Sequence, residues 1–92
     1  MRLFALFGTD AGAEETKTLS KRLNKQYADQ YKNVGANQWV LAANETTTEV
    51  SDKLNIVDGG VGRVILVPFT TWFGWHDTDL WEWLDIRLSS DE

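Results

Sequence analysis

The apolar segment Leu3-Phe4-Ala5-Leu6-Phe7 lies near the start of the chain and is closed by Gly8-Thr9-Asp10. A short apolar segment that ends in turn-forming residues is typical of a strand buried in the centre of a sheet. The segment also imitates the apolar part of a signal peptide, but it is shorter than the roughly seven to fifteen residues that such a part needs. We therefore predict a central β-strand over residues 3–7.

A helix is predicted after this strand, from about Glu14 to Tyr31. Acidic residues occupy its first turn, where the positive end of the helix dipole stabilises them. Side chains at intervals of four residues form the stripe that we expect to face the core, namely Leu19, Leu23, Tyr27 and Tyr31. A second stripe with the same spacing is basic and consists of Lys17, Lys21 and Lys25. We interpret it as a solvated helix face, with contact to phosphate groups as the alternative.

The middle of the chain predicts a hairpin and a short helix. Gln38–Ala43 is an apolar strand that follows turn-forming residues, and residues 32–37 have room for a short strand before it. Thr46 and Glu49 have the spacing of a capping box, in which each residue satisfies a backbone amide of the other. This spacing predicts a second helix over about Thr47–Leu54.

The last predicted strand is Arg63–Thr70. Proline cannot donate a ladder hydrogen bond, so Pro68 indicates that this strand lies at the edge of the sheet. A short helix capped by Asp79 is favoured next, and it carries Leu80, Trp83 and Leu84. Residues 84–88 also alternate between apolar and charged side chains, so a strand is the alternative there.

The order of elements, β-α-β-β-α-β followed by an aromatic extension, is that of a ferredoxin-like α+β fold. In this arrangement the first strand is central and the fourth is at an edge, in agreement with residues 3–7 and Pro68. We expect one domain over residues 1–88 and a solvated tail over residues 89–92. If residues 32–37 form only a loop, the alternative is a three-stranded β-α-β-α-β sheet.

The composition limits the chemistry that the chain can carry. The absence of cysteine excludes disulfides, thiolate metal sites and a cysteine nucleophile, and a single histidine excludes a histidine pair. His76-Asp77-Thr78-Asp79 is interpreted as a polar turn. Gly59-Gly60-Val61-Gly62 follows a helix and enters a strand, which is the reverse of a phosphate-binding loop. We therefore expect no cofactor and no metal site, and an enzyme is not the favoured class.

The net charge of −5 is distributed unevenly along the 92 residues. Residues 1–32 contain six basic and four acidic side chains, whereas residues 33–92 contain three basic and ten acidic ones. An acidic surface repels a phosphate backbone, so we expect no nucleic-acid contact through the C-terminal part. No segment approaches the ~18 apolar residues of a membrane span, and we expect a cytoplasmic protein that does not contact a membrane.

Three segments together resemble a known family. They are the strand over residues 3–7 with its polar loop, the segment Asn37-Gln38-Trp39-Val40-Leu41, and the last strand followed by an aromatic-glycine step and Leu80-Trp81-Glu82-Trp83-Leu84. This pattern spans most of the chain and is similar to that of small ferredoxin-like proteins related to the CRISPR-associated spacer-acquisition endoribonuclease, including the VapD and SinR-like families. The resemblance implies a metal-dependent nuclease. Its nuclease members place a metal-binding aspartate at the end of the first strand, where this chain has Gly8, and this departure argues against the nuclease activity. A shift in register would make Asp10 the candidate, for which capping of the following helix is the alternative role.

Tryptophan is unusually frequent, with five in 92 residues and four of them between Trp72 and Trp83. A helix that buries Leu80 and Leu84 also buries Trp83 and leaves Trp81 about 200° away around its axis. We therefore predict a partner-binding surface made of Trp72, Phe73, Trp75 and Trp81, because aromatic side chains anchor protein interfaces. The alternative is that the segment folds back and completes the core.

These features favour a small acidic, non-catalytic protein-interaction module that self-associates, with a homodimer as the expected form. Two alternatives stay open. One is a metal-dependent nuclease of the family named above. The other is an acidic inhibitor that competes with nucleic acid for a basic partner, which is suggested by six acidic residues and one basic residue over residues 77–92.

Overall fold

The described residues form four strands and three helices in a computed structural model, which describes residues 1–9, 13–57, 62–74 and 78–89. The elements are β1 (Arg2–Gly8), α1 (Ala13–Tyr27), β2 (Tyr31–Gly35), β3 (Gln38–Ala43), α2 (Thr47–Leu54), β4 (Val64–Phe69) and α3 (Thr78–Ser89). Strand β3 and helix α2 have the predicted bounds, and β1 and β4 differ from prediction by one residue at each end.

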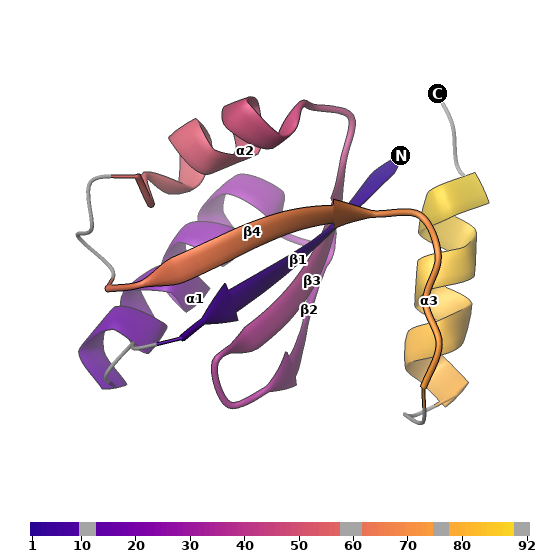
Figure 1. The fold of residues 1–92 in the computed structure, drawn as a ribbon, viewed down its shortest axis with the longest axis horizontal. Helices are drawn as coiled ribbons and strands as arrows, with labels where there is room; N and C mark the ends of the chain where they lie inside the picture. Colours follow the sequence, from indigo (N-terminus) through magenta and orange to yellow (C-terminus); the bar gives the residue numbers. More distant parts are fainter. Residues whose placement is uncertain (10–12, 58–61, 75–77, 90–92) are drawn as a thin grey trace.

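The strands form one antiparallel sheet in the order β2-β3-β1-β4 (Figure 1). As predicted, β1 is central and β4 is an edge strand, in which Pro68 lies opposite Phe4. Residues 31–35 form β2, so the three-stranded alternative is wrong. The fold is α+β, a four-stranded antiparallel sheet with three helices in the described part of the chain, and α3 distinguishes it from a strict ferredoxin-like topology.

Helices α1 and α2 cover one face of the sheet, which we call the first face (Figure 1). Successive side chains of a strand point to opposite faces, so β1 contributes Phe4 and Leu6 to the first face. The buried side chains of this core are Phe4, Leu6, Leu19, Leu23, Tyr27, Trp39, Leu41, Ala43, Val50 and Leu54. The predicted apolar stripe of α1 is therefore confirmed as far as Tyr27.

Helix α2 is held at both ends by hydrogen bonds. The Glu49 amide donates to the Thr46 hydroxyl (3.2 Å) and the Thr46 amide donates to the Glu49 carboxylate (2.8 Å), which confirms the predicted capping box. At the other end, the Arg22 guanidinium donates to the carbonyl oxygens of Leu54 (2.9 Å) and Asn55 (3.1 Å). Because Arg22 belongs to α1, these bonds tie the two helices together.

The predicted end of α1 at Tyr31 is wrong, because the helix ends at Tyr27. The Gln30 amide donates to the Tyr27 carbonyl (2.7 Å), and Tyr31 then begins β2 opposite Leu41. Both tyrosines contact the first-face core, one from the helix and one from the sheet. The four-residue spacing of Tyr27 and Tyr31 therefore arises because both side chains pack in the same core, and not because they belong to one helix.

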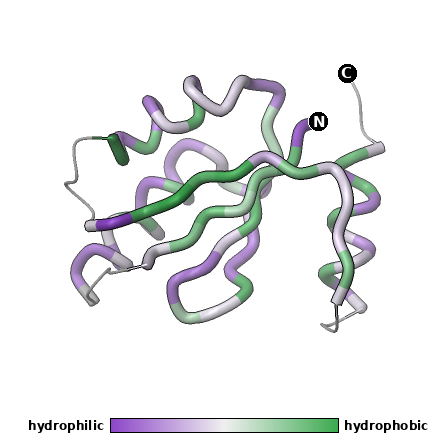
Figure 2. The backbone as a smooth tube through the Cα atoms, viewed as in Figure 1, coloured by the Kyte–Doolittle hydropathy of each residue, from purple (hydrophilic) through white to green (hydrophobic). Residues whose placement is uncertain are grey.

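Helix α3 packs on the opposite face of the sheet, which we call the second face (Figure 1). Leu80 and Leu84 of the helix lie among the strand residues Leu3, Val40 and Ala42. Figure 2 shows that hydrophobic residues continue along most of β4. The sheet is thus apolar on both faces, with two helices on one face and one helix on the other.

The bounds of α3 correct three predictions. It extends from Thr78 to Ser89, so the strand alternative for residues 84–88 is wrong. Asp79 lies in the first turn of the helix and not at its cap. Ser89 belongs to the helix and not to the predicted tail, of which residues 90–92 lie outside the described residues. No helix in the described residues is long and apolar enough to cross a membrane.

Candidate interaction surface

The second face presents three rows of side chains that run across β3, β1 and β4. The register places Ala42, Leu3 and Phe69 in one row, Val40, Ala5 and Val67 in the next, and Gln38, Phe7 and Ile65 in the third. Helix α3 packs against the first row. The third row is left uncovered, and the second row is covered only in part: Phe7 is 39% exposed, Ile65 52% and Val67 39%.

An apolar groove of about 360 Å³ lies beside this uncovered part. The row of Val40, Ala5 and Val67 lines it from the sheet. The other lining residues are Phe7, Phe69, Thr71, Trp72 and Leu84, so both α3 and the segment after β4 contribute. Ala5 is the small residue between Leu3 and Phe7 on this side of β1, and the space that its short side chain leaves deepens the groove.

The segment after β4 adds two of the predicted partner-binding residues. Trp72 is half-buried, with its ring perpendicular to that of Phe69 at a centroid distance of 5.9 Å. Its neighbour Phe73 is fully exposed. We define the open face as Phe7, Ile65, Val67, Trp72 and Phe73, which together with the groove form the candidate interaction surface.

The prediction that Trp81 is exposed and Trp83 is buried is wrong. Both side chains are half-buried and pack against the second-face core. The buried residues of α3 are Leu80 and Leu84, and at about 100° per residue the two tryptophans flank the line between them at similar angles. Each indole therefore covers one side of the helix contact.

Arg87 anchors the C-terminal half of α3 and so fixes one wall of the groove. Its Nε donates to the side-chain oxygen of Gln30 (3.0 Å) and its Nη2 donates to the Asp29 carbonyl (3.2 Å). The guanidinium also lies 4.8 Å from the centre of the Trp83 ring, a cation–π distance. These contacts join α3 to the turn between α1 and β2.

The exposed charged side chains of α1 and α3 lie away from the groove, whereas Lys32 of β2 pairs with the groove-lining Val40. Lys17, Lys21 and Lys25 are exposed on α1, which covers the first face, as expected for a solvated basic face. Asp79, Glu82 and Asp85 are exposed on α3, at angles of about 120° or more from its buried line. The residues that line the apolar groove are thus uncharged, and Lys17, Lys21, Lys25, Asp79, Glu82 and Asp85 lie on the outer sides of the helices.

Tyr27, Glu45 and Lys53 form a polar cluster where α1 and the end of β3 meet α2. The Tyr27 hydroxyl donates to Glu45 Oε1 (2.9 Å), and Lys53 Nζ lies 2.6 Å from Glu45 Oε2. The hydrogen bond from Lys53 lowers the pKa of Glu45, whereas burial and the bond to Glu45 raise the pKa of Tyr27. Both shifts move the groups away from neutral pH, so the cluster is suited to holding elements together and not to transferring protons.

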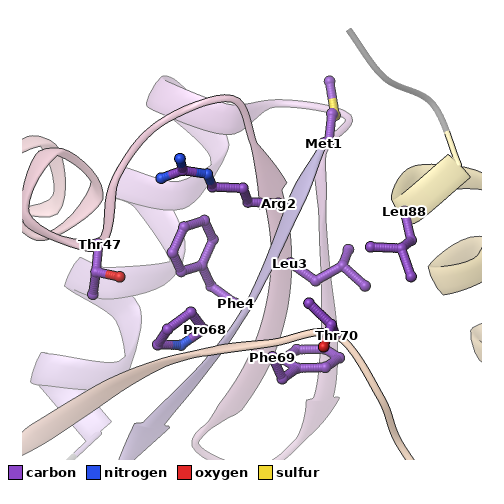
Figure 3. A pocket seen from close by; sticks show the side chains of 9 residues that line it. All are labelled: Met1, Arg2, Leu3, Phe4, Thr47, Pro68, Phe69, Thr70 and Leu88. Carbon is purple, nitrogen blue, oxygen red and sulfur yellow. The ribbon is translucent and has the colours of Figure 1, made fainter.

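A second hollow, of about 490 Å³, opens beside the start of β1 (Figure 3). Arg2 and Thr47 lie on its α2 side, and Leu88 lies on its α3 side. The Arg2 guanidinium donates to the Glu45 carbonyl (3.3 Å), and the capping box already binds an amide of the first turn of α2. Because the Arg2 guanidinium and this amide of α2 both have partners within the protein, we assign no ligand to this hollow.

The structure does not place the remaining predicted residues. Asp10, Trp75 and the segments 59–61 and 76–77 lie outside the described residues, and no group of three His, Cys, Asp or Glu side chains that could hold a metal ion occurs within them. Sequence reasoning missed Phe7, Ile65 and Val67. The alternation of apolar side chains along two neighbouring strands could have pointed to these three residues. This alternation does not indicate which of the side chains a helix leaves uncovered.

No protein-family model, no curated protein and no solved structure matches the chain. The resemblance to the CRISPR-associated endoribonuclease group therefore stays a prediction that rests on the sequence pattern. The geometry of the second face is the evidence from which a function can be argued.

Proposed function

We propose that this protein is a non-catalytic interaction module that self-associates through the open face. The observation that carries the proposal is the exposure of Phe7 (39%), Ile65 (52%) and Val67 (39%) on the second face, together with that of Phe73 (100%), which directly follows the groove-lining Trp72. Soluble proteins rarely expose large apolar patches, so an exposed patch of this kind marks an interaction site.

The area of the open face is suited to a second copy of the chain. Taking about 200 Å² for an aromatic and about 150 Å² for a branched aliphatic side chain, the exposed fractions correspond to roughly 400 Å² of apolar surface. Homodimer interfaces are about 65% apolar, so this surface would belong to an interface of roughly 600 Å² per copy. That value approaches the about 800 Å² per partner of a standard-size interface.

We propose contact between the faces of two sheets and not pairing of their edge strands. Strand β4 is at the sheet edge, where a second chain could in principle add a strand. Pro68, the fifth of the six residues of this strand, cannot donate a hydrogen bond, and proline at an edge is a known obstacle to such pairing. The apolar side chains of Ile65 and Val67 instead point to the second face.

The first six elements, β1 to β4 with α1 and α2, support the finer proposal of a ferredoxin-like unit to which α3 is added. The element order and the sheet order agree with this description. In this proposal α3 covers about half of a second face that is open in the basic arrangement. Phe7, Ile65 and Val67 of the open face lie on the part that α3 does not cover.

Ile65→Asp, matched with Val57→Asp, tests the proposed function. Ile65 is 52% exposed on the open face, and Val57 is 74% exposed in the segment after α2, so both introduce the same charge at an exposed position. Light scattering after size-exclusion chromatography is expected to show a dimer for the unmodified chain and for Val57→Asp, and a monomer for Ile65→Asp.

The salt dependence separates a second copy from a basic partner. Each copy carries a net charge of −5, so two copies repel each other and added salt should strengthen their association. A monomer at all concentrations that binds a basic protein, and releases it as salt is added, would instead support the acidic inhibitor. Equal dimerisation of both Asp variants would refute the open face as the interface.

A further inference from the structure

The fully exposed Phe73 directly follows Thr71 and Trp72, two residues that line the apolar groove. We propose that Phe73 and the groove are the two complementary parts of a two-fold interface, in which Phe73 of each copy enters the groove of the other. This inference rests on the proposed function, because it names the contact through which a second copy binds.

Phe73 has the features of an inserted side chain. The preceding Trp72 is held by its edge-to-face contact with Phe69, whereas Phe73 is 100% exposed. The following Gly74 has a φ of 149°, a conformation that residues with side chains rarely adopt. Phe73 thus lies between an anchored tryptophan and a glycine in a conformation that other residues rarely adopt.

The groove has the size and the lining of a site for a phenyl ring. Its volume of about 360 Å³ exceeds the about 150 Å³ of an apolar protein cavity that holds benzene. Seven of its lining residues are apolar, and the eighth is Thr71. Ala5 lies at its floor, directly opposite Val67 in the β1–β4 pair.

The neighbourhood of the two features matches what a two-fold interface requires. In such an interface the same patch serves both copies, so it must carry a protruding part and its complement together. Thr71 and Trp72 line the groove and Phe73 follows them, yet Phe73 is fully exposed and so does not occupy its own groove. A second copy turned by 180° can receive this side chain and donate its own.

Two variants separate the protruding part from the groove. Phe73→Ala removes the inserted ring and keeps the groove, whereas Ala5→Leu partly fills the groove and keeps Phe73. Val67→Lys is a second blocking variant at an exposed strand position, in case the central strand does not tolerate Ala5→Leu. Sedimentation equilibrium gives the dimer dissociation constant of each variant, and circular dichroism confirms that each is folded.

Each variant alone is expected to raise the dissociation constant by about 100-fold, because two aromatic insertions are lost per dimer. An equimolar mixture of Phe73→Ala with either blocking variant retains one intact insertion, from the blocked copy into the open groove. The mixture is therefore expected to associate about tenfold more tightly than either variant alone. This recovery is specific to reciprocal insertion.

The outcomes distinguish this inference from the proposed function. If the unmodified chain is a monomer at all concentrations, the proposed function itself fails. If the unmodified chain dimerises, Ile65→Asp abolishes the dimer and Phe73→Ala leaves it unchanged, the open face stands and the insertion is refuted. A mixture that associates no better than its separate components also refutes reciprocal insertion.

Discussion

Removal of Arg87 tests whether α3, which forms one wall of the groove, depends on its anchor to the turn between α1 and β2. Arg87 is half-buried, so each of its hydrogen bonds to Gln30 and Asp29 contributes about 0.5–1 kcal/mol, below the value for a fully buried charged group. The cation–π contact with Trp83 contributes a similar about 0.5–1 kcal/mol. Arg87→Ala is therefore expected to lower the free energy of unfolding by about 2 kcal/mol.

Arg87→Lys keeps the positive charge but loses the fork of donors that contacts two acceptors at once, so its expected cost is about 1 kcal/mol. Lys21→Ala is the control, because it removes the same charge from an exposed helix position and is expected to cost less than about 0.5 kcal/mol.

Urea unfolding followed by far-UV circular dichroism gives these free energies, with all variants at one protein concentration because association adds to apparent stability. The decrease for Arg87→Ala corresponds to a Tm lower by roughly 8–16 °C in a domain of this size. Hydrogen exchange should accelerate in α3 more than in α1 or the central strands. A cost for Arg87→Ala no larger than that for Lys21→Ala would show that α3 does not depend on this anchor.

Three further predictions follow from the first-face side of the molecule. Thr46→Ala removes half of the capping box and should cost about 1 kcal/mol in urea unfolding, whereas Thr46→Ser should cost little. The pKa of Glu45 is lowered from 4.5 in the folded state, so its contribution to stability is present above pH 4.5 and is lost as the pH falls through the lowered value. Glu45→Gln should therefore flatten the acid side of the profile of stability against pH, and an unchanged profile would refute this. Trp39 is 1% exposed and its indole N–H has no hydrogen-bond partner among the described residues, so Trp39→Ala should cost about 3–5 kcal/mol and Trp39→Phe much less; equal costs would indicate a partner for the N–H group.

Elements with a strong local signal could be predicted from the sequence. The apolar segment over residues 3–7 predicted the central strand, and the capping box of Thr46 and Glu49 gave α2 its correct start. Both signals are local, since hydrogen bonds within four residues or a continuous apolar segment determine them. The end of α1 could not be predicted in this way, because Tyr31 contacts the same core from a strand as it would from a helix.

The candidate surface was only partly predictable for a related reason. Trp72 and Phe73 were expected at a surface; in the structure Trp72 lines the groove and Phe73 is fully exposed. Phe7 belongs to a strand that was predicted to be buried, and the prediction of an edge strand over residues 63–70 did not say whether Ile65 and Val67 are covered. Their exposure depends on where α3 docks on the sheet, which is against Leu3, Val40 and Ala42. Tertiary docking of this kind leaves no local signal.

Sedimentation equilibrium of the unmodified chain over a wide concentration range tests the central claim most directly, with Ile65→Asp and Val57→Asp measured alongside it. Self-association through the open face predicts that the mass rises from 10.5 kDa towards twice that value as concentration increases. It predicts the same rise for Val57→Asp and a constant 10.5 kDa for Ile65→Asp. A constant monomer mass for the unmodified chain at every concentration and salt condition would contradict the account.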